Sequence, residues 1–140
     1  MLFRSHADGK GPIFGDFGGG FWVGQSAMRI AIATLDGRDS AQDLVTLLDK
    51  ELSEYRSLAD TTGVLASQLC IRAAKTVALG AEKGSVNAKR ILEEGARYLA
   101  ATISAAWSKV TPDGKVPALS IQGGLSKSPF YVEQIGRAHV

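Results

Sequence analysis

The chain has 140 residues, 45% of them hydrophobic and 21% charged, and it contains 16 glycines but only 4 prolines. This composition predicts one compact domain with a buried core and excludes a disordered or collagen-like chain. The formal net charge of +2 is too small to indicate a nucleic acid or an anionic membrane as a partner. No apolar run approaches the ~20 residues of a membrane span. A single cysteine excludes an internal disulfide, so we expect a reducing, cytoplasmic location.

Residues 1–20 predict a short hairpin followed by a glycine loop. The pair Asp8-Gly9 separates the apolar run Leu2-Phe3 from residues 12–14, and Asp-Gly between apolar runs is typical of a hairpin turn. Residues 15–20 contain four glycines, which cost too much conformational entropy inside a strand or a helix. We therefore expect two short strands and then a loop.

The middle of the chain predicts four helices, because its apolar residues recur at three- and four-residue spacing. The first covers residues 21–35 and ends in a turn at residues 36–39. Ser40 is expected to cap the second helix, with Asp43 three residues further on in a capping-box arrangement.

The third helix covers roughly residues 60–83 and stops at Gly84, where glycine favours the end of a helix. Ser85 then caps the fourth helix, whose apolar residues span about five turns. The residues expected in the core of these four helices are Val23, Ala27, Ile30, Ala31, Leu44, Leu47, Leu48, Leu52, Leu65, Leu69, Ala73, Val77, Ala88, Ile91, Leu92, Ala96, Leu99, Ile103 and Ala106.

After these helices the chain predicts a turn, a strand and the start of a further helix. Pro112-Asp113-Gly114 forms the turn, residues 116–121 indicate a short buried strand, and a glycine turn at residues 122–125 precedes the helix. The expected fold class is therefore α/β and rich in helix, with an N-terminal hairpin, about four helices and one late buried strand.

Residue types that carry catalysis or bind metals are sparse. His6 and His139 are the only histidines, and no carboxylates lie near either at the spacing of metal ligands, so we predict no metal site. Cys70 lies between apolar residues and is expected to act as a small buried hydrophobe. The triplet at residues 16–18 matches the metal-binding Asp-Phe-Gly of protein kinases, but the other kinase motifs are absent and we reject that interpretation.

Two glycine segments are the candidate binding sites. Residues 9–16 end in Asp16, where the backbone can approach a ligand closely and the carboxylate can accept hydrogen bonds from sugar hydroxyls. The alternative is an ordinary turn in which Asp16 caps a helix. Gly123-Gly124 follows the predicted strand and precedes Ser126 and Ser128, as in a strand-to-helix turn that contacts a nucleotide. The alternative there is a glycine turn without a ligand.

The order and spacing of these segments resemble one family. Residues 9–24, G-K-G-P-I-F-G-D-F-G-G-G-F-W-V-G, are similar to the pattern G-W-G-P-x-x-G-D-E-G-S-G-Y-W-[IL]-G, and an Asp-Gly-Arg turn follows at residues 36–38. Residues 81–92 and 118–128 are similar to its later helix junction and its late strand with a glycine turn. The chain thus resembles the N-acetylglucosamine kinase-like BadF/BadG/BcrA/BcrD ATPases of the actin-like/sugar kinase/Hsp70 superfamily.

This resemblance implies a fold and two sites. The fold is the C-terminal lobe of an actin-like, ribonuclease H-like ATPase. The sugar pocket is implied at Gly9, Lys10, Gly11 and Asp16, and the turn that contacts adenosine is implied at Gly123, Gly124 and Ser128. Three positions depart from the family pattern, namely Lys10 in place of Trp, Phe17 in place of Glu and Gly19 in place of Ser.

The resemblance also implies that residues 1–134 are one lobe, truncated at both ends. The phosphate-gripping loop and the catalytic aspartate belong upstream in the family, so no catalytic residue is expected in this chain. ATP and Mg²⁺ are the implied cofactors, with Mg²⁺ held mainly by the other lobe, and a small sugar is the implied substrate. The sequence leaves open whether the chain forms a homodimer.

The last six residues, 135–140, are interpreted as a tail derived from a sequencing adapter. Ile-Gly-Arg-Ala-His-Val is what ATC GGA AGA GCA CAC GTC encodes, and that string is a reading frame of a common short-read adapter. Under this interpretation Arg137 and His139 have no functional meaning.

The leading functional hypothesis is ATP-dependent phosphorylation of an amino sugar, N-acetylglucosamine or glucosamine, by a longer parent protein. The first alternative is an ATPase that activates a 2-hydroxyacyl-CoA dehydratase, which needs a cysteine-ligated iron–sulfur cluster that Cys70 alone cannot supply. The second is a non-catalytic sugar-sensing module of the same fold, suggested by the departures at Lys10, Phe17 and Gly19.

Overall fold

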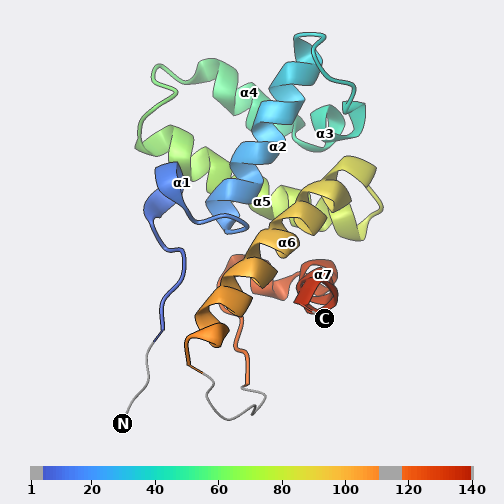
Figure 1. Cartoon of the computed structure of the whole chain (residues 1–140). Helices are drawn as coiled ribbons and strands as arrows, with labels where there is room; N and C mark the ends of the chain where they lie inside the picture. Colours follow the sequence, from blue (N-terminus) through green and yellow to red (C-terminus); the bar gives the residue numbers. More distant parts are fainter. Residues whose placement is uncertain (1–4, 111–117, 140) are drawn as a thin grey trace.

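The computed structural model describes residues 5–110 and 118–139, which form seven α-helices and one 3-10 helix (Figure 1). In chain order these are α1 (Gly11–Phe14), α2 (Gly20–Leu35), α3 (Gln42–Leu47), α4 (Asp49–Ser57), α5 (Val64–Glu82), α6 (Val86–Ser108), η1 (Gly124–Lys127) and α7 (Pro129–His139).

The core lies where α2 and α5 pack along each other and α6 and α7 close the bundle. Val23 of α2, Val77 of α5 and Leu92 of α6 are completely buried there. Ile135 of α7 is 2% exposed and joins the same cluster. Each such aliphatic side chain contributes about 1.5–3 kcal/mol of transfer free energy, so burial of these helix faces drives the fold.

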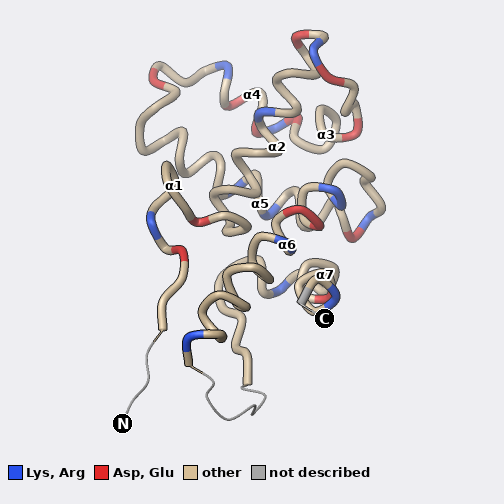
Figure 2. Tube along the Cα trace, in the orientation of Figure 1, with Lys and Arg blue, Asp and Glu red and all other residues tan. Residues whose placement is uncertain are grey.

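Charged side chains are distributed along the outer parts of this bundle. Figure 2 shows Lys and Arg interspersed with Asp and Glu on the described helices rather than gathered on one of them. Among the described helices, α5 alone is long and apolar enough to cross a membrane by length and composition, and 39% of its apolar window is buried inside the structure. A core helix passes the same test.

Three of the four predicted helices are confirmed. The helix expected at residues 21–35 is α2, and the one expected at about 60–83 is α5, although its first turn is missing and Leu65 is 64% exposed rather than buried. Gly84 has a φ of +98°, and the hydroxyl of Ser85 accepts a hydrogen bond from the amide of Ala88 at 3.3 Å. Glycine and serine thus end one helix and begin the next as predicted.

The predicted second helix is wrong in its start and in its continuity. It begins at Gln42 with Ala41 as the N-cap, no side chain caps it, and it breaks at Leu48 into α3 and α4. Ser40 is therefore not the cap. Asp43 points to another helix, because its carboxylate accepts hydrogen bonds from the Ser85 hydroxyl at 2.8 Å and from the backbone amide of Asn87 at 3.0 Å. A tertiary partner has replaced the local capping box.

The predicted α/β class is also wrong, since residues 5–110 and 118–139 contain no strand. Residues 11–14 form the helical turn α1 instead of the second hairpin strand. Residues 118–121 are irregular, and Leu119 is 52% exposed instead of buried. A strand needs a neighbour for its backbone N–H and C=O groups, and the described residues offer none beside this segment. The Leu2-Phe3 run, the turn at residues 112–114 and residues 116–117 lie outside the described residues.

The contact between α2 and α5 depends on a glycine. A Cβ atom built on Gly24 would overlap the carbonyl oxygen of Cys70, so the two helix backbones touch at this point. Gly20, in the same helix, has no heavy atom within 4 Å of such a Cβ. These two glycines therefore form a matched pair, one needed for packing and one not.

We expect Gly24→Ala to lower the free energy of unfolding by about 3 kcal/mol or more, because the clash is with backbone and cannot relax by a side-chain rotation. Gly20→Ala should change it by no more than about 1 kcal/mol, in the stabilising direction. Urea unfolding followed by circular dichroism measures both. Equal stability of the two variants would contradict the close approach of the helices.

A second prediction concerns Asp43. Desolvation alone would raise the pKa of Asp43, but the hydrogen bonds from Asn87 and Ser85 outweigh it, so the pKa is lowered in the fold. A lowered carboxyl pKa gives stability that is present above the unfolded value of about 3.9 and lost as the pH falls through the folded value. We expect Asp43→Ala to destabilise the protein by about 1–2 kcal/mol at neutral pH. The difference in free energy of unfolding between wild type and variant should shrink below about pH 4 in urea unfolding curves. A difference that stays constant with pH would exclude the ionised carboxylate as its source.

Candidate functional site

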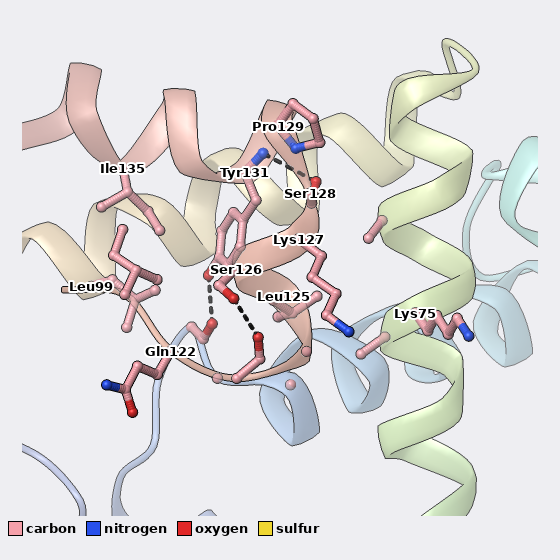
Figure 3. Close-up of a pocket in the computed structure, with 18 of the residues that line it drawn as sticks. Lys75, Leu99, Gln122, Leu125, Ser126, Lys127, Ser128, Pro129, Tyr131 and Ile135 are labelled. Atoms are coloured by element: carbon pink, nitrogen blue, oxygen red, sulfur yellow. Dashed lines mark hydrogen bonds between the residues drawn. The ribbon is translucent and has the colours of Figure 1, made fainter.

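A pocket of about 840 Å³ opens between α5, α6, the η1 turn and the start of α7 (Figure 3). Its volume lies in the range of small-molecule sites, about 300–1,000 Å³. Its walls are mainly apolar and include Ile71, Leu79, Leu99, Ile103 and Leu125. The charged side chains around it include Arg72, Lys75, Glu82 and Lys127, and Arg72 is already paired with Glu54. The pocket can therefore hold a flat apolar group with a polar end.

The glycine turn at residues 123–128 forms one wall of this pocket. Gly123 has a φ of +106°, a conformation that favours glycine. Both the amide and the hydroxyl of Ser126 donate to the Gly123 carbonyl oxygen, at 3.1 and 2.6 Å, and close the turn. A Cβ on Gly124 would meet no heavy atom within 4 Å. The turn thus presents bare backbone to the pocket, as close approach of a planar ligand requires.

Ser128 lies at the end of this turn and is 6% exposed. Its hydroxyl accepts a hydrogen bond from the amide of Tyr131 at 3.2 Å and donates to a carboxylate oxygen of Glu82 at 3.2 Å. The same Glu82 oxygen accepts from the amide of Phe130 at 2.8 Å. Ser128 and Glu82 therefore satisfy the free amides at the start of α7. The predicted role of Ser128 as an adenosine contact stays a prediction.

The N-terminal glycine loop reaches the other side of the same pocket. Gly18, Gly19 and Gly20 line it, whereas the predicted sugar ligand Asp16, two residues before Gly18, does not. Gly19, not Asp16, is the N-cap of α2, and no side chain caps that helix, so the helix-capping alternative for Asp16 is wrong. The tertiary structure thus brings Gly18, Gly19 and Gly20 and the late glycine turn to one pocket.

Asp8 shapes this loop and was missed as a site residue. Its carboxylate accepts hydrogen bonds from the amides of Asp16, at 2.6 Å, and Phe17, at 3.1 Å. Asp8 and Asp16 have φ values of +63° and +58°, which are uncommon for residues other than glycine and are held here by these contacts. The Asp8-Gly9 pair was a visible signal, but it predicted a hairpin turn.

Tyr131 closes the loop from the opposite side. It is 2% exposed, and its hydroxyl donates a hydrogen bond to the Gly18 carbonyl oxygen at 2.5 Å. Burial raises the pKa of Tyr131 well above its usual value, so the hydroxyl remains a donor at physiological pH. Gly95 of α6 leaves room for this contact, since a Cβ there would lie 2.7 Å from the tyrosine oxygen. No signal in the sequence pointed to Tyr131.

None of the four predicted sugar residues, Gly9, Lys10, Gly11 and Asp16, lines this pocket. Gly9 and Gly11 have left-handed φ values of +68° and +82°, and the exposed Lys10 between them is the N-cap of α1. The structure therefore brings Gly18, Gly19 and Gly20 to the pocket, but not the predicted sugar segment at residues 9–16.

The residues flagged as candidate metal ligands or nucleophiles form no second site. Within residues 5–110 and 118–139 no three His, Cys, Asp or Glu side chains gather as metal ligands would. The Nε2 atom of His6 forms a hydrogen bond with the backbone oxygen of Asp8 at 2.7 Å. Cys70 is only half-buried, and burial raises the pKa of its thiol although Arg29 opposes the shift, so it is a weak nucleophile at neutral pH. The side chain of His139 lies outside the described part.

Comparison with known proteins shows the family of this chain. A model of the BadF/BadG/BcrA/BcrD ATPase family matches residues 4–138, whereas no curated protein matches the sequence significantly. Because the match spans nearly the whole chain, the protein is an ATPase of the actin-like/sugar kinase type. It belongs to the BadF/BadG/BcrA/BcrD ATPase family, as its motifs had indicated.

Proposed function

We propose that this chain is the C-terminal lobe of a kinase that uses ATP to phosphorylate an amino sugar, N-acetylglucosamine or glucosamine. One observation carries the proposal: Gly18, Gly19 and Gly20, which follow the segment that resembles the family's sugar-binding motif, line the same pocket as the late turn that resembles its adenosine-binding motif. A kinase must hold its two substrates side by side, because phosphoryl transfer depends on their relative position.

The wall at Gly123 and Gly124 suits the adenosine half of ATP. Flat bases bind between apolar surfaces, and the Leu125 and Ile71 side chains supply such surfaces next to the turn. Lys127 is exposed and points across the pocket toward α5 in Figure 3, where an ammonium group can attract phosphate oxygens. The bare backbone, the apolar walls and the free cation together fit a nucleotide.

The loop that follows Asp8 suits the sugar. Asp16 can accept hydrogen bonds from two sugar hydroxyls, and its backbone is fixed by the Asp8 carboxylate. Gly9 and Gly11 would offer backbone groups further from the pocket. Lys10, where the family pattern has Trp, would replace a flat apolar contact with a mobile cation, which alters the preference among amino sugars.

In this mechanism the chain binds and orients, while the other lobe performs proton transfer. ATP supplies the phosphoryl group. Gly123 and Gly124 would fix adenosine, and Asp16 would fix the sugar hydroxyls and keep the acceptor oxygen in line. The resemblance to the family assigns Mg²⁺ and the catalytic base to the other lobe. Closure of the two lobes would exclude water from the transferring group.

The proposal is tested by assaying the full-length parent for ATP-dependent phosphorylation over a panel of hexosamines. We expect turnover with N-acetylglucosamine or glucosamine. ATP binding without turnover of any sugar would overturn the kinase assignment. Sugar binding without transfer would indicate a sensing module, and an iron–sulfur absorption band in the purified parent would indicate a dehydratase activator.

Gly124→Val tests the nucleotide wall within this chain. The new side chain would meet no protein atom at its Cβ but would occupy the pocket, so ATP affinity should fall at least about tenfold while stability changes by less than about 1 kcal/mol. Gly136→Val is the matched control, because Gly136 also has open space at its Cβ but lies in α7 outside the pocket. Calorimetric titration with ATP measures both variants. Equal affinity of the two would remove the turn from the nucleotide site.

A further inference from the structure

A continuous set of hydrogen bonds connects the late glycine turn to the N-terminal loop. Ser128, the last residue of the turn, accepts from the amide of Tyr131, and the hydroxyl of Tyr131 donates to the carbonyl oxygen of Gly18 (Figure 3). The two hydrogen bonds measure 3.2 and 2.5 Å, and Tyr131 itself is buried. The two walls of the pocket are therefore joined by a single side chain that solvent does not reach.

We propose that Tyr131 is a positioning residue that couples nucleotide occupancy of the pocket to the geometry of the Asp16 loop. This inference rests on the proposed function, because it takes the occupant of the turn to be a nucleotide. It adds a residue and a direction of communication: a ligand at Gly123 and Gly124 orders the loop that presents Asp16.

The loop needs such a contact because its conformation is unfavourable by itself. Asp16 has a left-handed φ, and the Asp8 carboxylate fixes the loop from one side by accepting hydrogen bonds from its amides. Tyr131 fixes the loop from the other side by its hydrogen bond to Gly18, whose φ is +86°. Uncommon backbone conformations persist only where several surrounding contacts fix them. Loss of either interaction should therefore make the loop more mobile.

The start of α7 is the element that can transmit the change. Ser128 and Glu82 bind the free amides of its first turn, and Tyr131 lies in that same turn. A ligand packed against the turn would shift or fix Ser128, and the tyrosine oxygen would move with it. Because hydrogen bonds weaken steeply with distance and angle, a small displacement is enough to strengthen or break the bond to Gly18.

The amides of Asp16, Phe17 and Gly19 report the state of the loop, since each donates a hydrogen bond within it. In the 140-residue chain, saturating ADP should slow their hydrogen exchange at least about fivefold, the lower range of typical coupling between sites. The Tyr131 ring resonances should shift in the same ADP titration. ADP binding that leaves these three amides unchanged would overturn the inference.

Tyr131→Phe removes the hydroxyl and keeps the ring. In this variant the three amides should exchange faster without ligand, and the ADP effect should fall to less than about twofold while the ADP Kd changes by less than about threefold. Tyr98→Phe is the matched control, because Tyr98 packs on Phe17 and Trp22 in the same region without forming the bond to Gly18. It should retain the full ADP effect.

Gly95→Ala provides a second variant that keeps Tyr131 itself, since its Cβ would stand 2.7 Å from the tyrosine oxygen and 3.1 Å from the Trp22 side chain. Like Tyr131→Phe, this variant should lose the slowing of amide exchange by ADP. If ADP binds and Tyr131→Phe keeps the full effect on the loop, the coupling is wrong and the nucleotide site stands. If ADP does not bind the wild-type chain, the nucleotide site itself is wrong, and the coupling to a nucleotide fails with it.

Discussion

The N-terminal loop meets helix α6 where Gly18 lies against the backbone of Gly95. A Cβ on Gly18 would stand 2.5 Å from the Gly95 carbonyl oxygen, and a Cβ on Gly95 would stand 2.7 Å from the hydroxyl oxygen of Tyr131. Only two glycines allow this approach, and the buried tyrosine then completes it with a hydrogen bond to Gly18. The pocket depends on this contact, because it brings the loop after Asp16 opposite the turn at Gly123.

The helices behind the pocket supply the rigidity that this contact needs. α2 and α5 touch at Gly24 and bury Val23, Ala27 and Val77 between them, so the start of α2 and the adjoining loop are fixed in place. The Asp43 carboxylate ties α3 to the start of α6. Close packing of this kind responds to small displacements as a unit rather than by local yielding. The proposed coupling between the two walls of the pocket depends on this rigidity.

The proposed kinase would divide binding and chemistry between its two lobes. In the proposed kinase, the glycine turns and apolar walls of the pocket and the nearby Asp16 would bind and orient two small molecules. Among the described residues no acidic cluster is available to hold a metal ion. This chain would orient the two substrates. The other lobe would stabilise the charge that develops on the transferring phosphoryl group.

The sequence by itself determined the elements whose causes are local. The helical spacing at residues 21–35, the left-handed Gly84 and the capping Ser85 were all predictable, and so was the family, because its motifs are contiguous segments. Only the tertiary structure decided which distant residues contact one another. Asp43 bonds to Asn87 rather than to its own helix, residues 118–121 have no neighbouring strand, and Tyr131 meets Gly18 from far along the chain. Hydrogen bonds and close contacts between distant segments leave no spacing in the sequence, because they depend on how the helices pack.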